Sequence, residues 1–330
     1  MTAQRTLNKR IILRRIRVGG IALLGLILFG IFFVETPVII KCAKDSLLIC
    51  GRIIIPSLFP FMVISSLLLL FGIDRLFAKL FGKIFEKIFK APREAISAFV
   101  LGVICGFPVG IQLSYSLYEE GKITDDELLH LLLFCNVQST AFIINTVGTT
   151  LLGSRRAGAF IYLSQIVALT VLGIAYPRVF KINKSGRATH LSIKSPRTSL
   201  AVKLTRSVGG AVTGILSICG FLIFFSVLCG ITFDISEKLR LASAVPLALS
   251  SIAEMTSGCI RVSQSLPHKG AFVVSSMILA FSGLSLHFQI FSLCKEARIN
   301  YGRFLICKIC AAAVAGVCAV AFDFIFKIFP

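Results

Sequence analysis

Two ionisable residues, Glu254 and Arg261, lie in the apolar segment 241–265, where their charges could act on a bound solute. An ionisable side chain inside a membrane is costly unless it is paired or hydrated, so each marks a candidate site. A continuous helix with about 3.6 residues per turn would place the two on one face, flanking Thr256 and Ser257. We expect Glu254 to carry a coupling proton and Arg261 to contact an anionic cargo. The alternative is that both only pair with other buried groups.

A second polar group interrupts the apolar segment 269–292. It consists of Ser282, Ser285, His287 and Gln289. The imidazole of histidine has an unperturbed pKa of about 6.5, which suits proton coupling. We therefore treat His287 as a candidate site residue together with Ser282 and Ser285. A histidine that is hydrogen-bonded only for packing is the alternative.

The segment 128–152 carries a similar interruption. Its polar residues are Asn136, Gln138, Ser139 and Thr140. They offer hydrogen-bond donors and acceptors at membrane depth, although such residues also pack helices against each other. We predict that they contact the cargo.

The preceding apolar segment, 94–117, contains a glycine- and proline-rich break formed by Gly106, Pro108 and Gly110. Such residues free backbone amides and carbonyls, which in lipid must be satisfied by protein, water or a ligand. Secondary transporters hold their cargo at broken membrane helices of this kind. The break is therefore predicted to form part of a substrate site with the polar groups above.

The composition indicates a polytopic, all-α membrane protein. Of the 330 residues 56% are hydrophobic, and the mean hydropathy is +0.90, whereas soluble proteins have roughly 45–50% apolar residues and lack repeated apolar runs. The net charge of +20 would also suit nucleic-acid binding. Here the Lys and Arg residues lie between apolar runs, which is typical of loops beside anionic headgroups. We expect a lipid bilayer and no nucleic acid as partner.

Chemistry that needs a metal, a cofactor or a nucleophile is not expected. Most of the eleven Cys residues lie in apolar runs, where cysteine is a small packing residue, and this includes the C-x-x-C pair Cys307 and Cys310. We find no zinc spacing, no phosphate-binding loop and no nucleophile–base pair. The sequence therefore predicts no metal, no cofactor and no enzyme activity.

The N-terminal residues 1–37 have the pattern of a signal anchor. Basic residues precede the apolar run 19–34 and no A-x-A cleavage site follows it. We expect this segment to remain attached, with the N-terminus in the cytoplasm. A second basic stretch, the linker 178–206, has no apolar face and is predicted to be a solvated cytoplasmic connector.

The segment 38–73 allows two interpretations. Pro56 and Pro60 break it sharply and leave arms that are short for a crossing, which favours a re-entrant hairpin with its tip at these prolines. A single kinked span is the alternative. The next segment, 75–90, has lysines on one helical face and large apolar residues on the other, so we predict an amphipathic helix in the membrane interface.

Seven further apolar segments follow along the chain. The candidate spans before the linker are 94–117, 128–152 and 157–176; the second half offers 207–232, 241–265, 269–292 and 301–327, of which 207–232 corresponds to the hairpin of the first half.

Short motifs recur in the same order before and after the linker, which predicts two repeats, 38–177 and 207–330. One hairpin and three spans in each repeat would give them inverted orientations. This arrangement makes the linker cytoplasmic but puts the lysine-rich helix 75–90 on the outer face, against the positive-inside rule. If 38–73 spans instead, the helix is inside and the linker falls outside.

Several motifs resemble those of sporulation integral membrane proteins of the YlbJ (SpoVV) type, a family built from nucleoside-recognition Gate domains. The motifs are Pro56–Phe61, Gly106–Gly110, Leu117–Thr124, Phe134–Asn136 and Glu254–Gly258. The resemblance implies a role late in the sporulation of an endospore-forming bacterium, namely moving dipicolinic acid out of the mother cell across the outer forespore membrane. It also implies a fold similar to the core of concentrative nucleoside transporters, with inverted hairpins and broken helices.

The leading hypothesis is thus a secondary transporter of a small organic anion in a bacterial membrane, with protons or Na⁺ as alternative coupling ions. Dipicolinate is a small planar dianion, which helix N-termini and Arg261 would suit. The alternatives are a permease for a nucleoside-like solute and a non-transporting scaffold of a sporulation membrane complex. Cargo, coupling ion, direction and oligomeric state are left open by the sequence.

Overall fold

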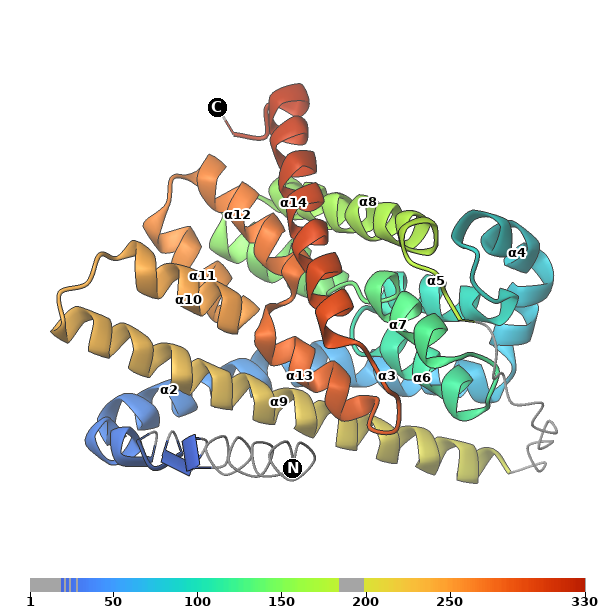
Figure 1. The fold of residues 1–330 in the computed structure, drawn as a ribbon, viewed down its shortest axis with the longest axis horizontal. Helices are drawn as coiled ribbons and strands as arrows, with labels where there is room; N and C mark the ends of the chain where they lie inside the picture. The colour runs from blue at the N-terminus through green and yellow to red at the C-terminus, as the bar shows by residue number, and fades with distance from the viewer. Residues whose placement is uncertain (1–18, 21, 24, 28, 184–198, 330) are drawn as a thin grey trace, which may run out of the picture.

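The computed structural model describes residues 19–183 and 199–329, apart from 21, 24 and 28, and every element assigned in these ranges is a helix (Figure 1). Most of the predicted anchor 1–37 and the centre of the linker 178–206 lie outside the described residues. Within the described part, five helices are long and apolar enough to cross a membrane: Thr36–Leu68, Arg155–Val179, Leu200–Lys238, His268–Leu293 and Tyr301–Phe326. The expected all-α membrane protein is confirmed.

The first of these helices is continuous through both prolines. Helix α2 (Thr36–Ile49), the π-helical turn η1 (Cys50–Ile54) and α3 (Ile55–Leu70) follow one another without a gap. A proline removes one backbone donor and crowds the preceding turn. Here the wider π-helical turn precedes Pro56, and the Ser57 hydroxyl donates to the Ile53 carbonyl at 2.6 Å. The chain therefore does not reverse, and the expected hairpin at 38–73 is wrong, whereas the single kinked span is correct.

Helix α4 (Ile73–Phe89) has the predicted amphipathic character. Several of its large apolar side chains are exposed: Leu76, Leu80, Phe81, Ile84 and Ile88. Phe85 and Phe89 instead pack on the bundle, where the Phe89 ring stacks on Phe134 at 4.8 Å between centroids. An exposed apolar face beside a lysine-rich face suits a helix that lies in the membrane interface. The 3₁₀ turn η2 (Arg93–Ala95) then leads into the bundle.

The chain reverses direction between α5 (Ile96–Cys105) and α6 (Val109–Glu119). Gly102 and Gly110 face each other across this turn, and a Cβ added at Gly102 would lie 3.0 Å from the Gly110 Cα. Each helix has ten or eleven residues, or about 16 Å, which is half the thickness of a bilayer core. The segment 94–117 is therefore a re-entrant hairpin and not the expected span.

A second hairpin joins α10 (Ala244–Ala253) to α11 (Met255–Ser265). A Cβ added at Gly258 would lie 2.7 Å from the Ser251 Cα, so the two helices are in backbone contact. The expectation of a continuous helical span over 241–265 is wrong, because Glu254 has an extended backbone between the helices. The argument that placed Glu254 and Arg261 on one face of one helix does not apply.

The next helix pair in each half is a broken span that continues in one direction. Helix α7 (Asp125–Phe134) and the π-helix η3 (Ala141–Leu151) both lie along α8 (Arg155–Val179). The order of contacts is antiparallel: Gly148 of η3 packs on Gly158, whereas His130 of α7 lies 2.8 Å from the Gly173 carbonyl.

The corresponding span in the second half consists of α12 (His268–Phe281), which lies along α14 (Tyr301–Phe326), and α13 (Gly283–Leu293), which meets α14 through aromatic side chains. His287 of α13 packs on Phe304, and Met277 of α12 approaches Gly316. Helix α14 also packs on α8, so the two long helices hold the broken spans together.

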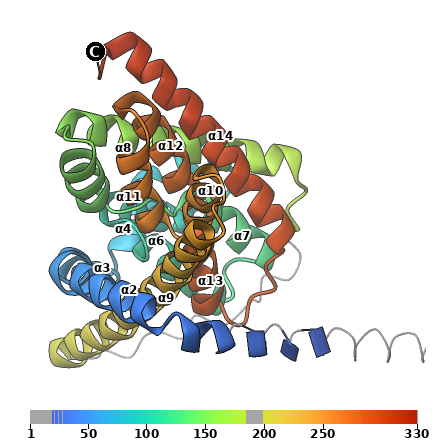
Figure 2. The same cartoon turned by 90° about the vertical axis from the view of Figure 1, so that its left-hand side faces the viewer.

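Helix α9 (Leu200–Lys238) runs antiparallel to α2 and α3, and it lies beside them in both views (Figures 1 and 2). At one end the Lys203 ammonium donates to the Leu70 carbonyl at 2.9 Å, and at the other Lys238 pairs with Glu35 at 2.7 Å. The order long helix, hairpin, broken span, long helix thus occurs once before and once after the linker.

This arrangement removes the conflict over sidedness. The hairpin α5–α6 returns to its own side, and α7–η3 and α8 are then two successive crossings. Helix α4 and the start of the basic linker therefore lie on the same side of the membrane. Both can then be cytoplasmic, in agreement with the positive-inside rule.

We predict that reporters fused after Lys90 and after Ile182 are both cytoplasmic. Green fluorescent protein should fluoresce at both positions, and alkaline phosphatase should be active only after Gly153 and after Leu266. These sites test the re-entrant hairpin, since a crossing by α5–α6 would place Lys90 and Ile182 on opposite sides.

Candidate functional site

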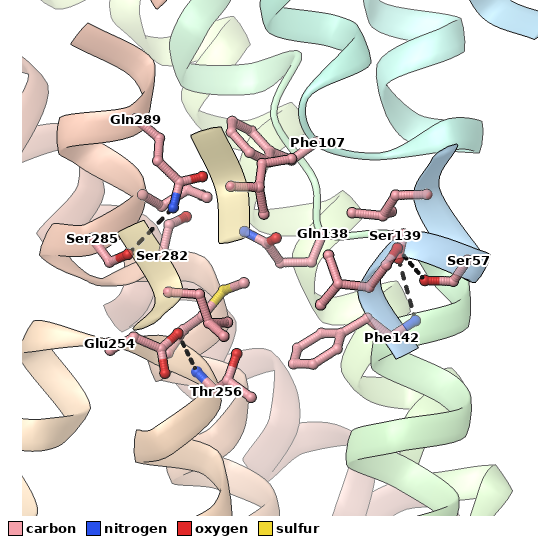
Figure 3. A pocket seen from close by; sticks show the side chains of 16 residues that line it. Ser57, Phe107, Gln138, Ser139, Phe142, Glu254, Thr256, Ser282, Ser285 and Gln289 are labelled. Carbon is pink, nitrogen blue, oxygen red and sulfur yellow. Dashed lines mark hydrogen bonds between the residues drawn. The ribbon is translucent and has the colours of Figure 1, made fainter. Parts of the chain in front are cut away.

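A cavity lies where the tips of the two hairpins meet the breaks of the two interrupted spans (Figure 3). It contains about 550 Å³ of space free of protein atoms, open solvent included. Its polar lining consists of Ser57, Gln138, Ser139, Glu254, Thr256, Ser282, Ser285 and Gln289. Its apolar wall includes Phe107, Phe142, Ile218, Leu222, Met255 and Leu286. Both halves of the chain therefore contribute.

The first hairpin is fixed to the break between α7 and η3 by its backbone. The Phe107 amide donates to the Val137 carbonyl at 2.7 Å. A Cβ added at Gly106, where φ is +79°, would lie 2.6 Å from the Ser139 Cα, and one added at Gly110 would lie 1.8 Å from the Cys135 carbonyl oxygen. Gly106 and Gly110 thus permit close packing and present no side chain to the cavity.

The predicted polar residues of this break divide into two groups. Gln138 and Ser139 line the cavity, and the Ser139 hydroxyl accepts from the Phe142 amide at 3.3 Å. Asn136 is buried beside the cavity lining, and both polar atoms of its amide lack a partner in the described part of the chain. Thr140 and Pro108 are not part of the lining; Pro108 is the residue before the first turn of α6.

Glu254 lies at the tip of the second hairpin and caps α11. Its carboxylate oxygens accept from the backbone amides of Thr256 at 2.9 Å and Ser257 at 2.6 Å, and the residue is 2% exposed. A helix N-terminus stabilises a negative charge, so the geometry supports a carboxylate here. Thr256 lines the cavity, whereas the Ser257 hydroxyl bonds to Ser226 at 3.0 Å.

Arg261 does not line the cavity. Its guanidinium lies 3.4 Å from the centroid of the Phe233 ring on α9, and the residue is half-buried. This position follows from the break at Glu254, because α11 starts anew there and turns Arg261 toward α9.

The break between α12 and α13 brings Ser282 and Ser285 to the cavity but not His287. The His287 Nε2 lies 2.8 Å from the Phe281 carbonyl oxygen, which can only accept, so this nitrogen holds the proton. The His287 ring packs on Phe281 and Phe304. Its proposed role in proton coupling stays a prediction.

Sequence reasoning missed several residues of the site. Gln289 lines the cavity and donates to the Ser285 hydroxyl at 3.3 Å; its position in the polar interruption was an available signal. Ser57 and Phe107 belong to the proline-containing motifs but had no assigned role. Lys308 was not among the predicted site residues; it is fully buried, and its ammonium donates to the Ser282 hydroxyl at 3.2 Å.

Three polar atoms that belong to the lining residues have no hydrogen-bond partner in the described part of the chain. They are Gln138 Nε2, Thr256 Oγ1 and Gln289 Oε1. Buried polar atoms in native proteins are nearly always satisfied, by protein, water or a ligand. These three come from both halves and surround one cavity, which makes it the candidate binding site.

One curated relative of this chain is the sporulation integral membrane protein YlbJ of Bacillus subtilis (strain 168). The two are 26% identical over 314 residues, covering 84% of this chain and 76% of the relative. This similarity supports the resemblance to YlbJ-type sporulation membrane proteins that the motifs predicted. No family model matches the chain, and no solved structure matches it. The chain is a membrane protein related to a sporulation membrane protein.

The close packing at the first hairpin tip predicts that Gly110→Ala disrupts the fold. The added methyl group would overlap the Cys135 carbonyl, so a loss of stability of about 1–3 kcal/mol or more is expected. Gly210→Ala is the matched control, since nothing lies within 4 Å of that position and alanine favours a helix. The readouts are the yield of monodisperse protein in detergent and its unfolding temperature. Equal stability of the two variants would contradict the packing.

Proposed function

We propose that this relative of YlbJ is a secondary transporter of a small organic anion, with dipicolinic acid as the favoured cargo. In this proposal it moves dipicolinic acid out of the mother cell across the outer forespore membrane during sporulation. The name of the relative supports the link to sporulation. A cavity lined by unsatisfied polar atoms from both halves supports a solute-binding function.

The proposal includes an inverted repeat, with 38–177 and 207–330 as the two copies. The recurrence of long helix, hairpin, broken span and long helix favours it. Since each copy has three crossings, the hairpin α5–α6 would enter from one side and α10–α11 from the other. Movement of either hairpin away from the cavity would then open it to one side only, as alternating access requires.

A permease for a nucleoside-like solute is the second candidate. Gln138, Thr256 and Gln289 offer both donors and acceptors, which would suit an uncharged polar ring as well as an acid. A scaffold that does not transport is the third candidate. It predicts that substitutions in the cavity have no effect on sporulation, whereas deletion of the linker does.

The decisive experiment is flux into proteoliposomes. Purified protein is reconstituted and offered radiolabelled dipicolinate or nucleosides, with a pH gradient, a Na⁺ gradient or neither. Dipicolinate flux above that of protein-free liposomes is expected. Flux of nucleosides alone would favour the second candidate, and no flux of any solute would contradict transport.

Gln138→Ala should lower dipicolinate flux severalfold without lowering the amount of protein in the membrane. The side chain makes no bond through its Nε2 within the described chain, so its removal costs little stability but deletes a donor to the cargo. Unchanged flux through this variant would count against the cavity as the transport path.

Glu254→Gln should abolish flux if Glu254 carries the coupling proton, because an amide does not titrate. The variant should still accumulate, since the amide oxygen retains one acceptor for the cap of α11. Glu237→Gln, at the exposed end of α9, is the matched control and should transport normally. Wild-type flux and wild-type pH dependence in Glu254→Gln would refute the role as proton carrier.

A further inference from the structure

The two helix N-termini that border the cavity differ in how they are capped. Helix α11 is capped by the Glu254 carboxylate, whereas α13 begins after Ser282 with no side-chain cap. Ser282 has a left-handed backbone with φ of +77°, and both Ser282 and Ser285 line the cavity. A helix N-terminus carries a partial positive charge and unsatisfied amides. No side chain in the described chain therefore caps the start of α13, whereas the start of α11 is already capped. Gly283, the first residue of α13, packs against the backbone at Met255, and the cavity is reached from Ser282 and Ser285.

A buried ammonium group contacts Ser282, the residue that precedes this uncapped N-terminus. Lys308 on α14 is 0% exposed, and its Nζ donates to the Ser282 hydroxyl at 3.2 Å. None of the ion pairs found among the described residues includes Lys308. The Phe304 ring centroid lies 5.7 Å from the Nζ, within the range of a cation–π contact.

Burying an ammonium group inside a membrane protein costs free energy unless the group is paired with a negative charge. The only carboxylate in the cavity lining, Glu254, is already bound to the amides of Thr256 and Ser257. The protein therefore leaves the charge of Lys308 without a matching anion of its own in the described chain. A cargo that brings a carboxylate to Ser282 would supply it.

The opposite wall provides a further donor. Gln138 is 4% exposed, its Nε2 has no partner in the described residues, and Figure 3 shows its amide pointing across the cavity toward the wall of Ser282 and Gln289. Phe107 and Phe142 supply aromatic rings to the lining of the same cavity. The arrangement suits a small molecule with an acidic group at one edge and a flat apolar body.

We propose that the cavity has an anion subsite at the start of α13, formed by the first amides of that helix, Ser282 and Ser285, with Lys308 as the counter-charge. The inference rests on the proposed transport function and identifies the acidic group as a carboxylate. It assigns to Lys308 the electrostatic role that the sequence suggested for Arg261, whose guanidinium is stacked on Phe233 instead. Lys308 acts as a positioning residue through Ser282.

The test measures the affinity of the full-length protein in detergent for two probes. One is radiolabelled dipicolinate, and the other is its uncharged diamide, which keeps the ring and its shape. Lys308→Met should weaken dipicolinate binding about ten- to a hundredfold, as for the loss of a charged hydrogen bond. Binding of the diamide should stay within about twofold of the wild type. Arg261→Gln, the matched loss of charge outside the lining, should leave both affinities unchanged.

A second variant tests the subsite independently, in case Lys308→Met does not fold. Ser282→Gly suits the left-handed backbone of that position and removes the hydroxyl that links Lys308 to the cavity. It should also weaken the binding of dipicolinate more than that of the diamide.

Equal weakening of both probes in Lys308→Met would show a structural role and overturn the subsite. Lys308→Met could also bind dipicolinate with wild-type affinity while the wild type transports dipicolinate. That result would overturn the subsite but leave the proposed function standing. A wild-type protein that neither binds nor transports dipicolinate would overturn the proposed function and the subsite with it.

Discussion

The structure depends on one constraint: a helix that ends inside a membrane leaves backbone groups that have no water to bond with. Seven helical segments in the described part of the chain have only ten or eleven residues, half of a bilayer core, and they end near one another. The ends satisfy each other where they can, as in the bond from the Phe107 amide to the Val137 carbonyl. What the ends do not satisfy becomes available to a solute.

Glycine residues allow the ends of these helices to pack closely against one another. Gly102 and Gly110 bring α5 and α6 into contact beside the Cys135 carbonyl, and Gly283 lies against the backbone at Met255 in the second half. Each contact is too close for a side chain. The glycines therefore position the hairpins, and polar side chains from neighbouring positions, such as Gln138 and Ser285, form the walls of the cavity.

Charge is distributed differently at the ends of the helices and at their centre. Ion pairs at the ends hold long helices together, as between Glu35 and Lys238 at 2.7 Å and between Asp126 and Arg303 at 3.4 Å. At the centre, the N-terminus of α11 stabilises the Glu254 carboxylate, whereas the Lys308 ammonium bonds to the Ser282 hydroxyl, which carries no charge. This imbalance is the electrostatic basis for proposing an anionic cargo, since none of the ion pairs among the described residues includes Lys308.

The sequence by itself determined the membrane class, the resemblance to a sporulation membrane protein, the amphipathic helix α4 and the breaks near Gly106, Asn136 and Ser282, because hydropathy, helical period and Gly or Pro content are local properties. Only the tertiary structure decided which segments turn back. Pro56 and Pro60 lie in a continuous helix, whereas the chain reverses around Gly106 and Glu254, and the sequence assigned these roles the other way round. A break frees backbone groups in either case; whether the halves continue or fold back depends on which neighbour satisfies those groups. The same long-range packing placed Lys308 behind Ser282 and Arg261 on Phe233, which no spacing within one helix could reveal.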